Sequence, residues 1–338
     1  MRYVGLDAHW RQSTFCVLDD RGRKILSQTV QGPWSKVLEE LEKIRKPFEV
    51  CFEASTGYGY LFERLQGLAR RVVVAHPGEL RLIFRSKRKN DRVDAEKLAK
   101  LLFLDEVPPV HVPREDVRAW RRMIGHRRKL VASRIRSKNA VRALLRSQGI
   151  EAPKGLWTRK GMAWLRSASL ATELDELQRD ILCEQIASLT RMIQRAHKLL
   201  NGIARRHPGV QLLKTIPGVG VRTAEAVVAH IDDPKRFHRV KTIGRYFGLV
   251  PSQDASGPTN RLGHITREGP SIVRYLVTEA AWQGIRRSRK LRTFYDRVLR
   301  DDRGRRKIAL VATAHHMLRI MLAMLQSGEL WRSDQTAA

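Results

Sequence analysis

The chain has 338 residues, of which 42% are hydrophobic, and this is enough for more than one domain with a buried core. Its 65 Lys and Arg against 34 Asp and Glu give a net charge of +31, and the cations are spread along the whole length. This charge indicates a long electrostatic contact with nucleic acid. It makes an anionic membrane surface the weaker alternative, because no amphipathic anchor with flanking aromatic residues stands out.

Three cysteines, Cys16, Cys51 and Cys183, lie far apart, which is unlike a disulfide framework or a zinc site. A strand is expected almost from Met1, which leaves no room for a signal peptide, and no run of eighteen apolar residues is found. We therefore expect a reduced, cytoplasmic protein without a membrane segment.

The first hundred residues alternate strands and helices. Hydrophobic periodicity predicts strands at 3–7, 13–18, 24–30, 48–53 and 71–76, and helices at 34–44, 60–68 and from Asp91 onward, with a turn at 77–78. Three strands thus come first, and strands and helices then alternate. This order is the one that an α/β ribonuclease-H-like fold requires, in which a three-strand meander is followed by parallel strands with crossover helices.

Four acidic residues fall at the ends of these elements. Asp7 and Glu53 end the first and fourth strands, where such sheets bind ligands, and Asp91 and Asp94 start the last helix. Asp91 could instead be the N-cap of that helix, with Asp94 three residues on as in a capping box. Carboxylates that lie close together repel one another unless a cation neutralises them, so the four together favour a two-metal phosphodiester site.

Runs of cations predict contacts with nucleic-acid phosphates. One run, which includes Lys87, Arg88 and Lys89, directly precedes the Asp91 helix. A long helix over 115–148 carries cations every two or three residues around an apolar seam. A charge run is usually a solvated face, but one so one-sided favours phosphate binding. The cations that we expect to bind there are Arg121, Arg122, Arg127 and Arg128.

A second long helix, over 174–199, has an apolar face like that of a coiled coil, formed by Leu174, Leu177, Ile181, Ile186, Leu189, Ile193 and Leu199. That face predicts either packing within the chain or dimerisation. Further helices are expected at 272–285 and 307–325. Pattern breaks divide the chain into a first domain at 1–105, a basic helical region at 106–206, a C-terminal domain at 207–330 and a tail at 331–338.

Two glycine-containing segments in the last third are candidates for phosphate contact. Gly218 and Gly220 lie between amphipathic helices, as in a helix-hairpin-helix, although a tight helix-helix turn requires the same residues. Residues 247–269 read as a polar loop that contains Arg261 and Arg267. Serines in such loops usually form local hydrogen bonds, so the pattern alone assigns them no chemistry.

Several motifs resemble those of the DEDD transposases of bacterial insertion sequences. They are Gly5-Leu6-Asp7, Phe52-Glu53-Ala54-Ser55-Thr56-Gly57, Asn90-Asp91-Arg92-Val93-Asp94-Ala95, and Gly248-Leu249-Val250-Pro251 followed by Ser256-Gly257. The resemblance implies a RuvC-like first domain in which Asp7, Glu53, Asp91 and Asp94 hold Mg²⁺ or Mn²⁺. It also implies that Ser256 is the nucleophile; Ser252 competes for that role but lacks the following glycine.

The resemblance further implies a transposase or site-specific recombinase that acts on donor and target DNA. In that family a noncoding bridge RNA guides the enzyme, and strand exchange predicts a homo-oligomer, either a dimer or a tetramer. Two alternatives remain open. A Holliday-junction resolvase-like, metal-dependent endonuclease would use the same acids with water as nucleophile, and a nucleic-acid-binding protein would need no catalytic residues.

Overall fold

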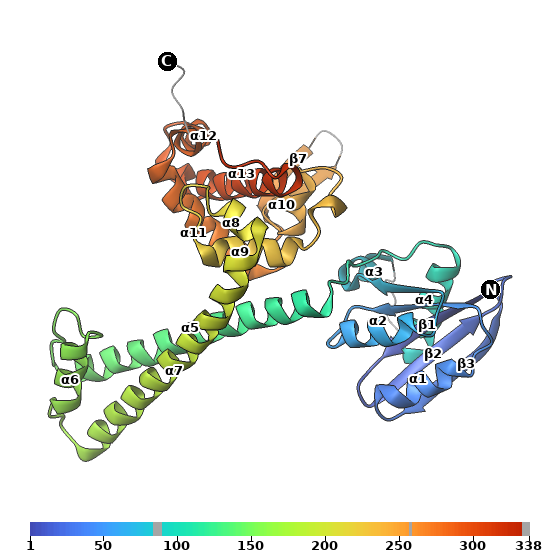
Figure 1. Cartoon of the computed structure of the whole chain (residues 1–338), viewed down its shortest axis with the longest axis horizontal. Helices are drawn as coiled ribbons and strands as arrows, with labels where there is room; N and C mark the ends of the chain where they lie inside the picture. The colour runs from blue at the N-terminus through green and yellow to red at the C-terminus, as the bar shows by residue number, and fades with distance from the viewer. Residues whose placement is uncertain (84–89, 257–258, 333–338) are drawn as a thin grey trace. The chain divides into compact units, whose positions relative to one another are not determined.

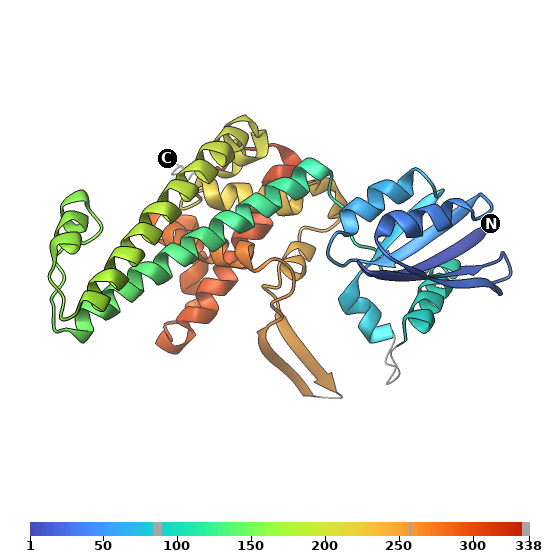
Figure 2. The ribbon, with the colours of Figure 1, turned by 90° about the horizontal axis from the view of Figure 1, so that it is seen from below.

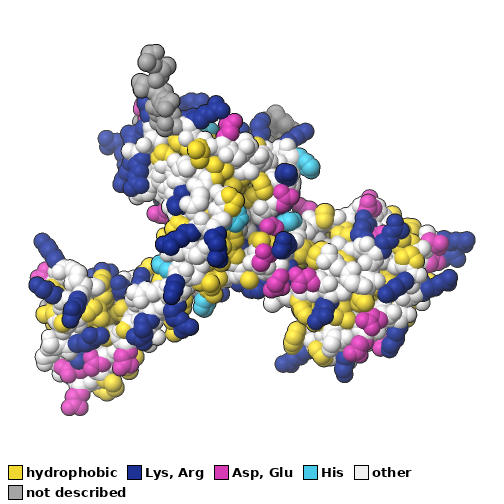
Figure 3. Space-filling model, viewed as in Figure 1, with side chains coloured by type: hydrophobic (Ala, Val, Ile, Leu, Met, Phe, Trp, Pro, Cys, Tyr) yellow, Lys and Arg dark blue, Asp and Glu magenta, His cyan; other side chains and the backbone are white. Residues whose placement is uncertain are grey.

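The computed structural model describes residues 1–83, 90–256 and 259–332 (Figure 1). The chain divides into two compact units, Met1–Glu115 (unit 1) and Asp116–Ala338 (unit 2). Lys and Arg side chains are exposed on both units (Figure 3), as the composition requires.

Unit 1 is an α/β unit built on a five-stranded mixed sheet. Its elements are β1 (Arg2–Ala8), β2 (Gln12–Leu18), β3 (Lys24–Gln31), α1 (Trp34–Glu42), β4 (Phe48–Glu53), α2 (Tyr58–Gln66), β5 (Arg71–Ala75), α3 (Pro77–Ile83) and α4 (Asp91–Phe103). The strand order is β3-β2-β1-β4-β5, in which β1, β4 and β5 are parallel and β1, β2 and β3 form an antiparallel meander. The predicted order of strands and helices is confirmed except for one additional helix, α3.

One predicted turn is wrong. Residues 77–78 begin the short helix α3, because the fixed φ of Pro77 suits a first helical turn and the Nδ1 of His76 accepts a hydrogen bond from the Glu79 backbone N–H at 3.2 Å.

Helices cover both faces of this sheet. α1 and α2 pack on one face, where Trp34, Leu41, Leu61 and Leu65 meet the even-numbered residues of β1, such as Val4 and Leu6. α4 packs on the other face. A Cβ atom added to Gly5 would lie 2.1 Å from the Ala95 carbonyl oxygen and 2.3 Å from the Ala99 backbone nitrogen. Only glycine at this position therefore allows α4 to lie so close to β1, and Asp7, two residues on, is on the same face.

Unit 1 extends beyond the boundary predicted at residue 105. The chain after α4 runs back along β5, where Ala75 and Pro109 form a bridge and the Val110 N–H donates to the Val74 carbonyl at 2.7 Å. Residues 106–115 thus belong to the first unit, because their backbone bonds to the edge strand.

Unit 2 is mostly helical. Its elements are α5 (Glu115–Ser147), α6 (Arg159–Ser167), α7 (Glu173–Arg206), α8 (Pro208–Leu213), α9 (Val221–Ile231), η1 (Pro234–Arg236), α10 (Thr242–Tyr246), β6 (Pro251–Ser256), β7 (Thr259–Ile265), α11 (Ser271–Arg287), α12 (Arg289–Leu299), η2 (Arg303–Arg305) and α13 (Arg306–Ser327). α5 and α7 run side by side (Figures 1 and 2), joined by contacts such as the Ser137–Gln185 hydrogen bond of 3.2 Å. The predicted middle and C-terminal regions share one core, because Trp120 and Leu200 pack among the C-terminal helices.

The apolar face predicted for the second long helix is only partly correct. On α7, Ile186 and Ile193 are buried as expected, together with Cys183, Ala196, Leu200 and Ala204, whereas Leu174, Leu177, Ile181 and Leu199 are exposed. The face of α7 that packs is therefore turned away from the predicted one.

α13 is the most apolar long helix. By length and composition alone, the stretch Arg303–Ser327 could cross a membrane. In unit 2, however, Met317, Leu318 and Met321 on this helix are fully buried in the main core. Its hydrophobicity is thus explained by packing against the surrounding helices.

Candidate functional site

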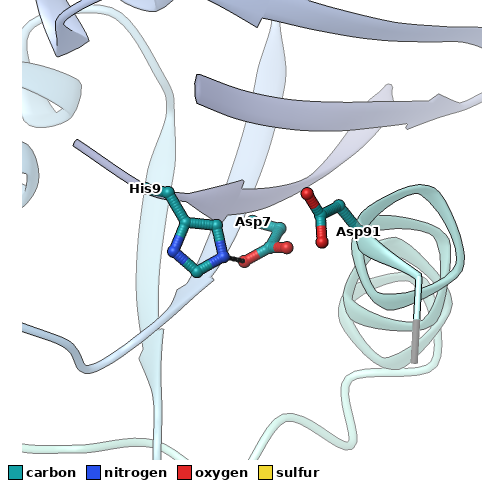
Figure 4. Close-up of side chains that lie close together, drawn as sticks. All are labelled: Asp7, His9 and Asp91. Atoms are coloured by element: carbon teal, nitrogen blue, oxygen red, sulfur yellow. Dashed lines mark ion pairs between the residues drawn. The ribbon is translucent and has the colours of Figure 1, made fainter. Parts of the chain in front are cut away.

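Asp7 and Asp91 meet at one edge of the sheet in unit 1. Asp7 lies near the end of β1 on the face that α4 covers, and Asp91 is the first residue of α4. Asp7, His9 and Asp91 each offer a ligand atom, and these atoms all lie within 4.8 Å of one another (Figure 4). The Nε2 of His9 is 3.3 Å from Oδ1 of Asp7, and Gln12 donates a hydrogen bond of 3.2 Å to Asp91. Groups of this kind can hold a divalent metal.

Asn90, not Asp91, is the N-cap of α4. The Asn90 side-chain oxygen accepts the Arg92 N–H at 3.0 Å, and its backbone is extended, with φ of −149°. The alternative in which Asp91 caps the helix is therefore wrong. Because Asn90 takes that role, the Asp91 carboxylate faces Asp7 instead (Figure 4). Asp94 follows one turn later, with the Lys97 ammonium 3.7 Å from its carboxylate.

The four predicted acids interact electrostatically. Burial raises the pKa of Asp7, and the carboxylates of Asp91, Asp94 and Glu53 raise this pKa further, whereas His9 opposes the shift. Glu53 comes close because β1 and β4 are adjacent and parallel, with Leu6 paired to Phe52 immediately before the two acids. Within unit 1, Asp7 and Asp91 thus lie at ligand distance from one another, whereas Glu53 and Asp94 act on Asp7 through their charge and are not part of that close group. A bound cation would relieve the repulsion among these acids.

His9 is a site residue that the sequence predictions missed. It lies two residues after Asp7, and residues two apart along a strand direction point to the same side. The Asp-x-His spacing at a strand end was the available signal. An imidazole at this position can hold the Asp7 carboxylate in place or donate a nitrogen to a metal.

The predicted phosphate-binding arginines of α5 differ in their surroundings. Arg121 donates to the backbone carbonyls of Ala229 and His230, at 2.6 and 3.1 Å, and so ties α5 to the end of α9. Arg127 bonds the His197 ring at 2.7 Å, and the Arg128 guanidinium lies over the Tyr275 ring at 4.9 Å. Arg122 is exposed. Lys87, Arg88 and Lys89 lie outside the described residues.

Two glycines form the predicted turn between α8 and α9. Gly218 has φ of +88°, and a Cβ there would lie 2.5 Å from the Gly284 backbone nitrogen on α11. Both its conformation and its packing therefore require glycine. Gly220 is the N-cap of α9, makes no side-chain cap bond and has no atom near its Cβ direction. The open side of Gly220 leaves room for a phosphate at this helix start.

The segment predicted as a polar loop is in fact a β-hairpin. β6 and β7 pair antiparallel, with Gln253 opposite Leu262 and Ser256 opposite Thr259. Figure 2 shows this hairpin (orange) extending from the helices of unit 2. The strands bond to each other and to no third strand in the described chain, and their side chains lack apolar alternation. The prediction failed because the described side chains at 251–255 and 261–264 are all exposed, so that they impose no hydrophobic period.

The two serines occupy different places on β6. Ser256 is the last residue of the strand. The Ser252 hydroxyl points toward β7, because a Cβ added to Gly263 would lie 2.4 Å from its Oγ. Arg261 is exposed on β7, and Arg267 is exposed just after that strand, in the left-handed region with φ of +59°.

The base of the hairpin is held by Arg274 of α11, a residue that sequence reasoning did not select. Its Nη1 donates to the carbonyls of Phe247 at 3.2 Å and Gly269 at 3.1 Å, and also to that of Glu268. Gly248 has φ of +61°, and a Cβ there would collide with the Glu268 backbone at 2.3 Å. The two ends of the hairpin are therefore interlocked, and we call this contact the hairpin root.

Comparison with known proteins identifies relatives over most of the chain. Residues 4–149 match the DEDD transposase family of IS110 type, and residues 210–296 match the family described as Transposase IS116/IS110/IS902. The chain is 26% identical over 341 residues to the transposase for insertion sequence element IS1111A of Coxiella burnetii, which covers 98% of this chain and 92% of that protein. It is 28% identical over 243 residues to the transposase for IS1328 of Yersinia enterocolitica, which covers 70% of each chain.

Proposed function

The chain belongs to the IS110/IS116/IS902 family of DEDD transposases, enzymes that cut and rejoin DNA, and we propose that Ser256 and an acidic metal site carry out this chemistry. The observation that carries the proposal is the meeting of Asp7 and Asp91 at one edge of the sheet, where their ligand atoms and that of His9 lie within 4.8 Å of one another. The four predicted acids and Ser256 lie inside the two segments that match the family.

We propose that unit 1 has a ribonuclease-H-like fold. The support is the strand order β3-β2-β1-β4-β5, with an antiparallel meander beside parallel β4 and β5. In such a sheet the carboxyl ends of the central strands form the ligand site, and Asp7 and Glu53 lie at the ends of β1 and β4.

The residues present fit a divalent metal. Asp7, Glu53, Asp91 and Asp94 would hold it through oxygen ligands, which suit Mg²⁺ or Mn²⁺. When bound, the metal would supply a positive charge that activates a hydroxyl and stabilises charge on the phosphate. The His9 imidazole, which suits Mg²⁺ poorly as a ligand, would hold Asp7 in position by a hydrogen bond from outside the metal shell.

Ser256 would act as the nucleophile. Its hydroxyl oxygen attacks the phosphorus of a DNA phosphodiester, a P–O bond to serine forms, and the bond to one deoxyribose oxygen breaks. The serine proton passes to base or solvent, and the released deoxyribose oxygen takes up a proton. The phosphoserine ester conserves the bond energy, so attack by a hydroxyl of another strand rejoins the DNA without an external energy source.

The proposed partners are donor and target DNA, a noncoding bridge RNA and further copies of the chain in a dimer or tetramer. The net charge of +31 supports polyanionic partners, while the RNA follows only from the family resemblance. Since its substrate is DNA, we expect the enzyme to work in the cytoplasm. Proposed phosphate contacts are Lys87, Arg88, Lys89, Arg121, Arg122, Arg127, Arg128, Gly218, Gly220, Arg261 and Arg267.

A covalent-adduct assay tests the mechanism. The protein is expressed with its native flanking DNA, so that any RNA partner is made, and is incubated with labelled donor and target DNA and Mg²⁺. Products are separated on a denaturing gel. We expect a protein-linked DNA band from the unaltered enzyme and from Ser252→Ala, the matched control on the same strand. Ser256→Ala and Asp7→Asn should both lose the band.

A different pattern would favour the hydrolytic alternative. If Ser256→Ala cleaved DNA as fast as the unaltered enzyme, and no adduct formed in either, water would be the nucleophile. The protein would then be a metal-dependent endonuclease of the junction-resolving kind. Loss of the adduct in Ser252→Ala but not in Ser256→Ala would identify Ser252 as the nucleophile.

A further inference from the structure

A row of aromatic side chains lies beside the acidic site of unit 1. The ring centroids of Trp10 and Trp34 are 5.2 Å apart in an edge-to-face arrangement. Trp34 and Tyr60 are 6.1 Å apart, with only 21° between their planes. The Arg64 guanidinium lies over the Tyr60 ring at 5.4 Å. We call Trp10, Trp34, Tyr60 and Arg64 the aromatic row.

Trp34 attaches this row to the segments that carry the acids. Its indole N–H donates to the His9 carbonyl at 3.0 Å, and the His9 side chain contacts Asp7. Trp34 also lies against Gly57, in the segment that follows Glu53, where an added Cβ would be only 2.4 Å from the indole ring. The row is thus fixed to the ends of both β1 and β4.

The members of the row differ in exposure. Trp34 is 6% exposed and is part of the core, whereas Trp10 is 67% exposed and Tyr60 is 46% exposed. A scattered exposed apolar residue is ordinary, but two large aromatic side chains flanking a fixed indole beside an acidic site are a candidate contact surface. Trp10 precedes the cation Arg11, and Tyr60 carries Arg64, so the surface also suits an anion-bearing ligand.

We propose that Trp10 and Tyr60 form a stacking platform for an unpaired DNA base next to the phosphodiester held at the acidic site. The proposal rests on the function proposed above. Every base has a π face that can stack on an aromatic ring, and nearby cations hold the flanking phosphates. The base must be unpaired, because both faces of a base inside a duplex are already covered by its neighbours.

This platform would give the acidic site a positioning device. A metal held by the carboxylates would bind phosphate oxygens, which are the same at every position of the strand, so it alone could not hold a strand in one register. A base stacked on Trp10 fixes the position of its own nucleotide. The neighbouring phosphate is then held relative to Asp7, because Trp10 adjoins His9 in the chain, Trp34 bonds the His9 carbonyl, and the His9 ring contacts Asp7. The occupant is a DNA strand because a metal held by the adjoining acids would bind a phosphodiester, and because the chain is strongly cationic.

Binding by the full chain to two single strands of equal length tests the proposal. One strand is oligo-dT and the other is an abasic strand with the same phosphates, both labelled for fluorescence anisotropy and measured with EDTA so that no cleavage occurs. We expect Trp10→Ala to weaken oligo-dT binding about tenfold, equivalent to about 1.4 kcal/mol, with abasic binding unchanged. Trp10→Phe should restore most of the affinity because it keeps an aromatic face.

The controls separate stacking from damage to unit 1. Leu26→Ala removes another exposed apolar side chain, on β3, and should change neither affinity. Equal weakening of both strands in Trp10→Ala would overturn the proposal, as would an effect on RNA strands alone. A change of oligomeric state by light scattering, with DNA binding unaltered, would overturn it in favour of a protein contact.

The outcome is independent of the adduct assay. A base-dependent loss of affinity in Trp10→Ala, with no serine-linked DNA in the unaltered enzyme, would overturn the proposed mechanism and leave the platform as a nucleic-acid site. An adduct that forms normally, with Trp10→Ala binding both strands as the unaltered enzyme does, would overturn the platform alone.

Discussion

The acids of unit 1 and the serine of unit 2 are held in position in opposite ways. Asp7, Glu53 and Asp91 lie at the ends of elements that form the core, so their positions follow from buried packing. Ser256 lies on a two-stranded hairpin that forms no part of a larger sheet in the described chain. Its position depends on the hairpin root. The two candidate parts of one chemistry should therefore respond to different kinds of mutation.

The largest expected effect is that of Gly5→Val. A side chain at this position meets backbone atoms of α4 at 2.1 and 2.3 Å, and backbone cannot move aside as a side chain can. We expect unit 1 to lose roughly 3 kcal/mol or more of its unfolding free energy, since forced overpacking commonly costs 1–3 kcal/mol. Displacement of α4 would also move Asp91 from Asp7. Urea unfolding and the adduct assay measure the two effects.

Gly125→Ala is the matched control. Gly125 is on α5, and no atom lies within 4 Å of its Cβ direction. Alanine there should leave the adduct unchanged and raise stability by up to about 1 kcal/mol, because glycine weakens a helix interior. A Gly5→Val protein that keeps both its stability and its adduct would show that core packing does not position the acids.

The second prediction concerns the hairpin root. In Arg274→Met the three carbonyls of Phe247, Glu268 and Gly269 lose their shared donor. We expect a cost of about 1 kcal/mol, because water can replace the lost donor at the exposed carbonyls of Glu268 and Gly269. The adduct yield should still fall clearly, because the two ends of the hairpin lose the side chain that joins them. Oligo-dT binding at the aromatic row of unit 1 should not change. Arg287→Met, at an exposed position on the same helix, is the control.

An unchanged adduct yield in Arg274→Met would mean that pairing between β6 and β7 is enough to present Ser256. A fall in oligo-dT binding by the same variant would instead show that unit 2 takes part in strand binding. Binding of the strand at unit 1 would then not be independent of the hairpin root.

The same contrast explains what could be predicted from sequence. The strand ending at Glu53 and the helix beginning at Asp91 were predicted because buried faces impose a hydrophobic period on the chain. The βββ-α-β order predicted the arrangement of the strands, and that arrangement brings the end of the strand with Asp7 close to the start of the helix with Asp91. Local pattern and topology agree in unit 1, so most of its acidic cluster was accessible from the residues.

The errors have equally specific causes. Asn90 and Asp91 are both good capping residues, and only the direction of the chain entering α4 decides between them. In the β6–β7 hairpin the described side chains at 251–255 and 261–264 are exposed, so the sequence there has no hydrophobic period to detect. Arg274 acts through carbonyls that are brought together only by the folded root. Each of these depends on contacts between distant segments, which composition and spacing do not contain.

The third prediction is that the two units differ in their response to acid. Burial lowers the pKa of His230 from its usual 6.5 to about 4, with a small further effect of Arg121. Between these values the unfolded chain binds a proton that the folded chain does not, so unit 2 loses stability as pH falls. The loss from pH 7 to pH 5 is about 2 kcal/mol for this group. Burial and neighbouring acids raise the pKa of Asp7, so protonation of this group favours folded unit 1 and opposes the effect of Asp19, Glu40 and Glu96, whose pKa values are lowered. We therefore expect a weaker acid dependence of unit 1 than of unit 2.

Denaturant unfolding followed separately in the two units, at several pH values, checks this difference. His230→Phe should flatten the slope for unit 2, although burial lowers the pKa of His207 and His315 as well, so that some slope stays. His238→Gln, at an exposed position, should change nothing. Equal pH dependence of both units, in the same direction, would contradict the prediction.

The smallest expected effect concerns the rate of thiol labelling at Cys16, Cys51 and Cys183, each of which lies in a different small core cluster. Burial raises the pKa of Cys51 to about 12 and that of Cys16 to about 11, so neither thiol reacts in the folded protein near pH 8. Cys183 lies in the small separate core that α5, α6 and α7 share, and should be labelled at the lowest urea concentration. Mass spectrometry of pulse-labelled protein gives the order.

Cys16 and Cys51 are both paired with Gly5 across the sheet, one on each side of β1. They should therefore become reactive together, when β1 separates from its neighbours. Gly5→Val should weaken the pairing of β1 with its neighbours and leave the core around Cys183 unchanged. In that variant we therefore expect Cys16 and Cys51 to be labelled before Cys183. If Cys183 is still labelled first in that variant, the strain at Gly5 is absorbed without opening the sheet, and α4 has shifted while the strands stay paired.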